Sequence, residues 1–154
     1  MTDSRTHSAS RIIIAPPRAI FRAMIDPEAI LCWRPPDGMS AKIFTFNPRR
    51  GGHYRMAFIY SKPDPVRAKS TEAVDIFRGT FVELVPDEKI VEAVEFEAEG
   101  PEYQGIMTIT TTLVPVHGGT KVTFLAENVP AGISEADHKT GMDSTLKKLA
   151  NFIE

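Results

Sequence analysis

The chain has 154 residues, enough for one domain that buries a core of its own. Its charged and hydrophobic fractions, 25% and 42%, are ordinary for a globular domain, and its formal net charge is only −2. This balance offers no basic surface to nucleic acid or to an anionic membrane. The single cysteine, Cys32, has no partner for an intramolecular disulfide.

The apolar runs are all much shorter than a membrane span, and the polar N-terminus lacks the hydrophobic centre of an export signal. We therefore expect a cytoplasmic protein without membrane insertion. We also expect residues 1–10 to form a flexible tail ahead of a single domain over residues 11–154.

Short elements fill the first quarter of the chain. A β-branched run at residues 11–14 predicts a strand, which the following proline pair ends. Helical spacing then predicts one short helix near residues 19–24 and a second over residues 28–33. Prolines at 35 and 36 predict a loop after the second helix.

From Ser40 the hydrophobic period changes to two, which is typical of strands. Turn residues divide this part into six successive predicted strands, at 42–46, 53–60, 71–85, 90–97, 105–114 and 120–128. Gly79, inside the third of these strands, indicates a bulge or a bend.

The last predicted element is a long amphipathic helix over residues 134–154. Ser134 is a suitable N-cap, and Asp137 follows it in a variant of the capping box. One face carries an apolar stripe, formed by Met142, Leu146, Leu149, Ala150 and Ile153. Since an antiparallel sheet must cover one apolar face, we predict an α+β domain in which the sheet curves around this helix.

At this point the chain resembles a known superfamily, the helix-grip or START-like proteins, which include the Bet v 1 allergens and the polyketide cyclases. It is most similar to the family named after the activator of Hsp90 ATPase. The stretches that carry the resemblance include IAPPRAIFRAM at 14–24, FNPRRGGHYR at 46–55, FRGTF at 77–81, GGTKV at 118–122 and HKTGM at 138–142. Many family members have a tryptophan where this chain has Met142.

The resemblance implies a curved antiparallel sheet of six to seven strands wrapped around the C-terminal helix, with two short helices after the first strand. It also implies a deep cavity between the sheet and the long helix. Superfamily members hold lipids, hormones, polyketides or other apolar molecules in this cavity.

Aromatic and methionine side chains at inward positions are the best sequence sign of such a site, because small-molecule pockets are mainly apolar and methionine adapts to varied ligands. The alternative is that these side chains fill the core. Our candidate ligand-binding residues are Trp33, Phe44, Phe46, Tyr54, Met56, Phe58, Phe81, Met107, His138, Met142 and Leu146.

Two polar residues are candidates for proton transfer. His138 lies one turn before Met142, either as a polar anchor in the cavity or, more commonly for such residues, at an edge that reaches water. Glu92 shares a strand face with apolar residues, so it could be a buried acid with a raised pKa. We favour the alternative, in which Glu92 either has a partner such as an arginine across the sheet or is turned outward by the register. His7, in the tail, and His117, in a turn, are expected to be solvated.

The sequence contains no phosphate loop, dinucleotide fingerprint, zinc-protease helix or nucleophile elbow, and its four histidines lack metal-ligand spacing. We therefore expect no metal, no cofactor and no catalytic residue. The favoured function is binding of a hydrophobic small molecule, such as a lipid, a polyketide or an aromatic compound. One alternative is a cyclase or hydrolase that uses His138 or Glu92. The other is an interaction protein, either linked to a chaperone or acting as a homodimer.

Overall fold

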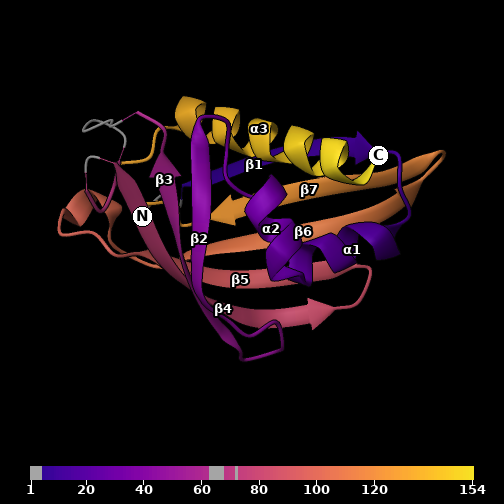
Figure 1. Ribbon diagram of the computed structural model, residues 1–154, viewed down its shortest axis with the longest axis horizontal. Coiled ribbons are helices and arrows are strands. Elements are labelled where there is room, and N and C mark those ends of the chain that lie inside the picture. Colours follow the sequence, from indigo (N-terminus) through magenta and orange to yellow (C-terminus); the bar gives the residue numbers. More distant parts are fainter. Residues whose placement is uncertain (1–4, 63–67, 72) are drawn as a thin grey trace.

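Seven antiparallel strands form one sheet, which curves around three helices (Figure 1). The computed structural model describes residues 5–62, 68–71 and 73–154. In chain order the elements are β1 (Thr6–Ile13), α1 (Pro17–Ile25), α2 (Pro27–Trp33), β2 (Met39–Phe46), β3 (His53–Tyr60), β4 (Val74–Val85), β5 (Lys89–Phe96), the 3₁₀ helix η1 (Pro101–Tyr103), β6 (Met107–Val116), β7 (Gly119–Glu127) and α3 (Glu135–Ile153). This arrangement confirms the predicted α+β helix-grip fold.

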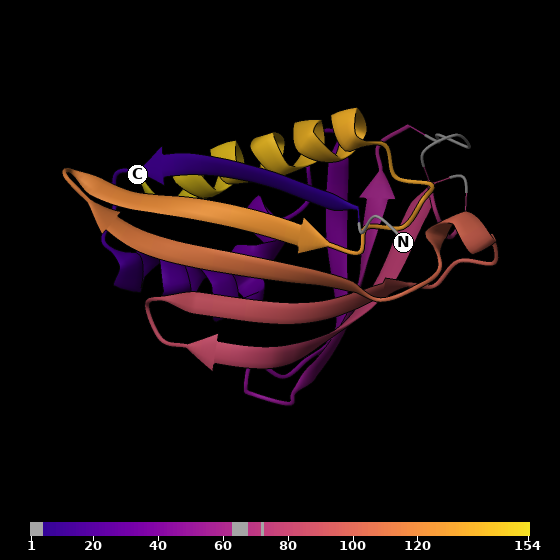
Figure 2. The same ribbon diagram turned by 180° about the vertical axis from the view of Figure 1, so that it is seen from behind.

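The strand order in the sheet is β1-β7-β6-β5-β4-β3-β2. Strands β2 to β7 therefore meander, and among the described strands only β1 pairs with a strand distant in sequence. Seen from behind, the outer face of the sheet carries no helix within the described part of the chain (Figure 2). The α-helices α1, α2 and α3 lie on the concave side, so that side holds the core. None of the described helices is long and apolar enough to cross a membrane.

Strand β1 begins earlier than the sequence predicted. It pairs with β7 from Thr6 opposite Glu127 to Ile13 opposite Thr120, so the predicted tail is wrong for residues 6–10. Residues 1–4 of that tail lie outside the described residues. The early part of β1 has small polar residues on its outer face, with His7 and Ala9 buried on the inner face. Residues 6–10 are low in hydrophobicity, so the sequence pattern did not predict this part of the strand.

Helix α3 has the start and the buried face that the sequence predicted. The Ser134 hydroxyl accepts a hydrogen bond from the Asp137 N–H at 3.1 Å and caps the helix. The buried residues are Met142, Thr145, Leu146, Leu149 and Ala150, while Ile153 is partly buried. The helix runs along β1 at one margin of the sheet and also packs on α2 (Figure 1).

Gly79 does not mark a bulge in β4, which was one of the two predicted alternatives. The register of β4 against β5 shifts between Phe81 and Glu83 instead. At position 79 a Cβ atom would overlap the ring of Tyr54, which lies over this glycine from the paired strand β3. The glycine is therefore needed for a close approach, and Tyr54 can lie flat against the sheet.

Gly141, in the interior of α3, has no such neighbour. The nearest atom to a Cβ at this position is Cγ of Pro36, at an ordinary contact distance of 3.9 Å. We expect Gly141→Ala to raise the free energy of unfolding by about 0.5–1 kcal/mol, because alanine loses less backbone entropy in a helix. Urea denaturation measures this change.

Gly118 provides the matched control. It also has open space around it, but its φ is +83°, which L side chains rarely adopt. Gly118→Ala should therefore lower the free energy of unfolding by about 1 kcal/mol. A loss of stability in Gly141→Ala would mean that the glycine has a packing role.

Candidate functional site

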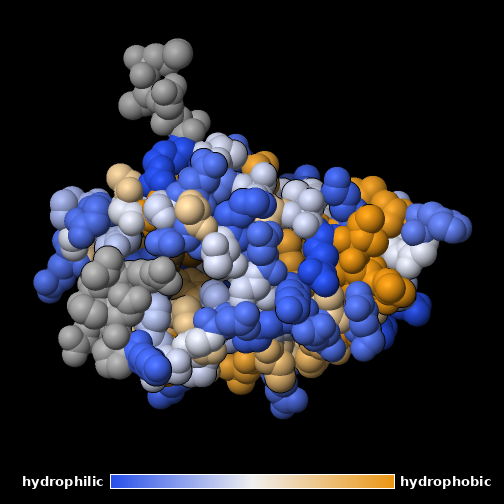
Figure 3. Space-filling view, turned by 90° about the horizontal axis from the view of Figure 1, so that it is seen from above, coloured by the Kyte–Doolittle hydropathy of each residue, from blue (hydrophilic) through white to orange (hydrophobic). Residues whose placement is uncertain are grey.

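A cavity of about 790 Å³ lies between the concave face of the sheet, α2 and the N-terminal half of α3. In the space-filling view a hollow on the upper face leads down to apolar side chains (Figure 3). Its apolar lining comes from both short helices and from strands across the sheet, and includes Met24, Trp33, Phe58, Phe77, Phe81, Val94, Phe96, Met107, Phe124 and Met142.

Six of the eleven predicted binding residues line this cavity: Trp33, Phe58, Phe81, Met107, His138 and Met142. The structure places the other five elsewhere. Tyr54, Met56 and Leu146 are at most 1% exposed and belong to the packed core around the cavity. Phe46 is half-buried and packs edge-on against Phe81, with ring centroids 5.8 Å apart. The binding roles of the lining residues remain predictions.

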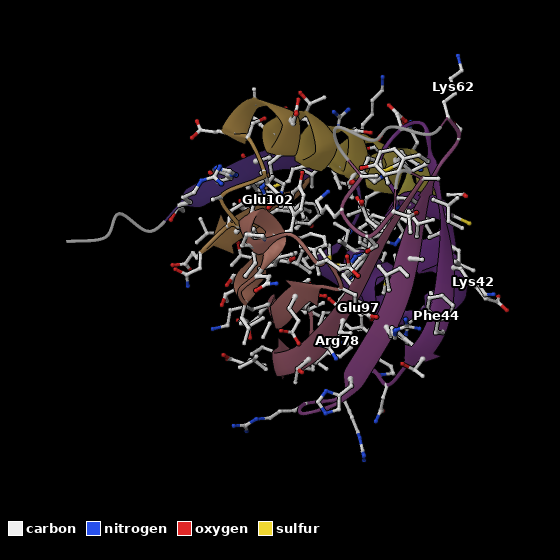
Figure 4. The ribbon with its side chains drawn as sticks, turned by 90° about the vertical axis from the view of Figure 1, so that its left-hand side faces the viewer. Lys42, Phe44, Lys62, Arg78, Glu97 and Glu102 are labelled. Atoms are coloured by element: carbon white, nitrogen blue, oxygen red, sulfur yellow. The ribbon has the colours of Figure 1, made fainter. Side chains whose placement is uncertain are left out.

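Phe44 lies on the opposite face of the sheet from the cavity. The register of β2 against β3 shifts between Ile43 and Thr45, so Phe44 and Phe46 do not share a face as strict alternation predicted. Phe44 is 40% exposed, and the Arg55 guanidinium lies 4.6 Å from its ring centroid. Figure 4 shows Phe44 and Lys42 on the outer side of β2. Including Phe44 in the cavity was therefore wrong.

Arg34, Tyr54 and Glu92 form a polar cluster at the cavity wall, which we call the Arg34 cluster. The Tyr54 hydroxyl donates to Glu92 Oε1 at 2.7 Å, and Arg34 Nη2 donates to the same oxygen at 3.0 Å. Arg34 Nη2 also lies 3.2 Å from the Tyr54 hydroxyl oxygen. The arginine and glutamate side chains are only 14% and 6% exposed, so this ion pair is largely removed from water.

The cluster fixes the protonation states of Arg34 and Tyr54. Burial alone would lower the pKa of Arg34, but the adjacent Glu92 and Tyr54 outweigh burial, and the pKa is raised. Burial, reinforced by the Glu92 carboxylate, raises the pKa of Tyr54 well above its usual value. At neutral pH Arg34 is therefore charged and Tyr54 keeps its proton. The structure thus supports the arginine-paired interpretation of Glu92, with the arginine coming from the loop after α2.

Helix α3 fixes the backbone that carries Arg34. The Thr145 hydroxyl donates to the carbonyl oxygen of Arg34 at 3.0 Å, and Lys148 Nζ donates to that of Pro35. The Asp37 N–H donates to the Ser144 hydroxyl at 2.8 Å. These bonds attach the loop after α2 to the long helix, so they determine where Arg34 enters the cavity.

A second ion pair lies nearer the 3₁₀ helix. Lys69 Nζ is 2.9 Å from Asp75 Oδ2, and these side chains are 15% and 5% exposed. The Tyr60 hydroxyl donates to the same oxygen at 3.0 Å, while the Lys69 N–H donates to Asp75 Oδ1 at 2.7 Å. Because both carboxylate oxygens are bonded within the protein, this cluster braces the segment before β4.

His138 faces His7 across the interface between α3 and β1. The two Nδ1 atoms are 2.8 Å apart, so one ring donates a proton to this bond and the other accepts it. Burial, followed by the nearby His7, Lys69 and Arg5, lowers the pKa of His138 to about 4. His7 is 4% exposed, which corrects the prediction that it is solvated. His138 lines the cavity, as the polar-anchor interpretation required.

This pKa predicts how stability depends on pH. The folded-state pKa of His138 is below its ordinary value of 6.5, so the unfolded chain binds more protons between these values. The contribution of His138 is therefore fully present above about pH 6.5 and is lost as pH falls toward about 4. In urea titrations, His138→Asn should lose less stability on acidification than the wild type.

Sequence reasoning missed four polar residues of this region: His7, Arg34, Lys69 and Asp75. Arg34 follows Trp33 directly in the sequence. Because Trp33 was a predicted binding residue, its position indicated that Arg34 lies near the cavity. His7 carried no local signal, because its partner His138 is 131 positions away. Lys69 and Asp75 are only six positions apart, but they fall in a predicted loop and a predicted strand, and no periodic pattern links the two. In the described part of the chain, no group of three or more His, Cys, Asp or Glu residues could hold a metal ion.

The fold and the cavity together define a helix-grip protein with an internal cavity. The profile of the family described as "Activator of Hsp90 ATPase homolog 1-like protein" matches residues 14–154. Since this match covers most of the chain, the protein belongs to that family, which confirms the resemblance. No protein of curated function matches the chain.

Solved structures agree with this assignment. The chain is similar to a crystal structure of a protein from Chromobacterium violaceum, with 32% identity and a TM-score of 0.86 over 97% of this chain and 96% of that one. A protein from Rhizobium loti shares 25% identity, with a TM-score of 0.74 and 97% of each chain covered. A protein from Rhodobacter sphaeroides shares the fold at 18% identity, with a TM-score of 0.72 over 95% and 90% of the two chains.

Proposed function

We propose that the protein binds a small molecule with a mainly apolar body in the cavity under α3. The observation that carries this proposal is a space of about 790 Å³ lined by aromatic and methionine side chains. This volume falls within the range of small-molecule sites, which are mostly apolar with a few convergent polar groups. The Arg34 cluster and His138 supply such polar groups at separate points of the wall.

Binding without catalysis is the simpler function for these polar groups. A histidine with a pKa of about 4 is a weak base at neutral pH, because general bases work best when their pKa is near the operating pH. Glu92 Oε1 already accepts hydrogen bonds from Arg34 and Tyr54. These bonds hold the carboxylate in place.

Thermal denaturation with libraries of lipids and aromatic compounds tests the proposal. A compound that binds only the folded protein must raise the melting temperature, and the rise must grow with its concentration. If no compound raised the melting temperature of the wild-type protein, the proposal would be contradicted.

Ala126→Phe provides a structural check on where a compound binds. Ala126 is 1% exposed and lines the cavity from β7, so a phenylalanine there would occupy part of the space. The variant should lose affinity for the largest ligands more than for small ones. Val114→Phe, at an exposed position of β6, is the matched control and should bind all ligands as the wild type does.

A proton-transfer enzyme of the cyclase or hydrolase kind is a second candidate, because Glu92 and His138 both line the cavity. Once a ligand is known, incubation with the protein and product analysis by mass spectrometry tests this candidate. Turnover that disappears in His138→Asn while binding persists would favour catalysis. An unchanged ligand after prolonged incubation would contradict it. A chaperone-linked role rests on the family description alone.

A further inference from the structure

The Arg34 cluster uses only part of its capacity for hydrogen bonds. A guanidinium carries N–H donors on Nε, Nη1 and Nη2, and a carboxylate accepts on both oxygens. Only Nη2 of Arg34 and Oε1 of Glu92 take part in bonds within the cluster. Among the described residues, the remaining donors of Arg34 and Oε2 of Glu92 have no side-chain or backbone partner.

These unused atoms are not sealed inside the protein. Among the described residues, no buried side-chain nitrogen or oxygen lacks a hydrogen-bond partner, so the free atoms of Arg34 and Glu92 are accessible. Both residues line the cavity. Asp75 differs, because both of its oxygens are bonded within the protein. The Arg34 cluster therefore presents free donors and a free acceptor to the cavity.

The side chains around the cluster keep these atoms in place. The Arg34 guanidinium lies 5.3 Å from the ring centroid of Tyr54 and 6.0 Å from that of Phe77. Trp33 and Phe81 add apolar surface to the same wall. A hydrogen bond made in such surroundings is stronger than one in water, and little ordering is needed when the ligand binds.

We propose that the Arg34 cluster binds a neutral carboxamide or hydroxyl group at the end of an apolar ligand, which accepts a hydrogen bond from Arg34 and donates one to Glu92. The charges of Arg34 and Glu92 cancel, so an anionic group attracted to the arginine is repelled by the carboxylate. A group that only accepts satisfies Arg34 but leaves Glu92 Oε2 without a donor. This inference rests on the proposed binding function and specifies the chemistry of the ligand.

Three probes with the same acyl chain test the inference. Decanamide both donates and accepts, methyl decanoate only accepts, and decanoate is anionic. Isothermal titration calorimetry on the full chain should rank decanamide tightest, by about tenfold over either other probe, which is the effect of one hydrogen bond to a charged group. Equal affinities, tightest binding of decanoate, or no binding of decanamide would overturn the inference. Equal affinities would leave the proposed binding function standing, whereas a library screen in which no compound raised the melting temperature would contradict that function.

A variant locates the preference in the cluster. The triple variant Arg34→Met, Tyr54→Phe and Glu92→Leu replaces all three polar groups with apolar ones of similar size, which buried ion pairs often tolerate. It should bind methyl decanoate at least as well as the wild type and lose the preference for decanamide. The matched control is Arg78→Met with Glu95→Leu, at an exposed ion pair that does not line the cavity, and it should keep that preference. If decanamide remained preferred in the triple variant, its amide would be recognised elsewhere and the inference would be overturned.

A spectroscopic measurement on the wild-type protein does not depend on the folding of the variant. The Nε–H resonance of Arg34 should shift in ¹H–¹⁵N spectra when decanamide is added, because Nε is among the free donors. An unchanged resonance at saturating decanamide, with other cavity resonances shifted, would overturn the inference even though the ligand was bound.

Discussion

Glu92→Leu is expected to lower the free energy of unfolding by about 3–5 kcal/mol, because it leaves the Arg34 charge without a partner in a largely buried place. The Arg34 side chain is only 14% exposed, and its bond to Glu92 Oε1 would be lost. The Tyr54 hydroxyl would also lose the oxygen to which it donates. Urea denaturation with linear extrapolation measures the loss.

Glu95, which lies on β5 like Glu92 and also pairs with an arginine, gives the matched control. Glu95 pairs with Arg78 across β4 and β5, at 2.6 Å, but these side chains are 42% and 57% exposed. Exposed ion pairs contribute about 0–1 kcal/mol, so Glu95→Leu should have a small effect. Equal small losses for the two variants would mean that water in the cavity solvates Arg34 well enough to replace Glu92.

The double variant Arg34→Met, Glu92→Leu separates the effect of the unpaired charge from that of lost packing. It should recover most of the stability that Glu92→Leu loses, since no uncompensated charge remains. A double variant as unstable as Glu92→Leu would indicate that the carboxylate stabilises the fold mainly through Tyr54.

Periodicity predicted most of this architecture because the strands of the sheet alternate regularly and the helix stripe is continuous. The prediction was wrong where an irregularity within a strand changes the face to which a side chain points. The register shift at Ile43 turned Phe44 outward, although nothing in its neighbours signals an inserted residue. The first half of β1 was missed because its outward residues are small and polar, and its pairing with β7 spans more than a hundred residues.

The candidate site was predictable where a side chain's apolar character decides its place. Trp33, Met107 and Met142 are large and apolar, and each lies at an inward position of its element. Arg34, Glu92 and His138 are placed instead by partners distant in sequence, so periodicity did not predict their contacts. Glu92 could be recognised as a candidate, but its partner Arg34 lies 58 positions away in the loop after α2. Only the folded chain brings these two residues together.

The two ends of α3 should respond differently to truncation of their apolar side chains. Leu149 is fully buried and does not line the cavity, whereas Met142 is 8% exposed and forms part of the cavity wall. Leu149→Ala should lower the free energy of unfolding by about 2–5 kcal/mol, because it removes contacts and leaves a void in a packed core. Met142→Ala should lose only about 1–2 kcal/mol, since a side chain beside an existing space has fewer packing partners.

Phe152→Ala controls for the general effect of truncation on this helix, because Phe152 lies on α3 but is 47% exposed. It should change stability by less than about 1 kcal/mol. Met142→Ala should in addition alter the affinity or the size limit for ligands, whereas Leu149→Ala should leave both unchanged in the folded protein. Large and equal losses at 142 and 149 would mean that side chains fill the space under α3. In that case the cavity would not be open to a ligand, and the binding function would be contradicted with it.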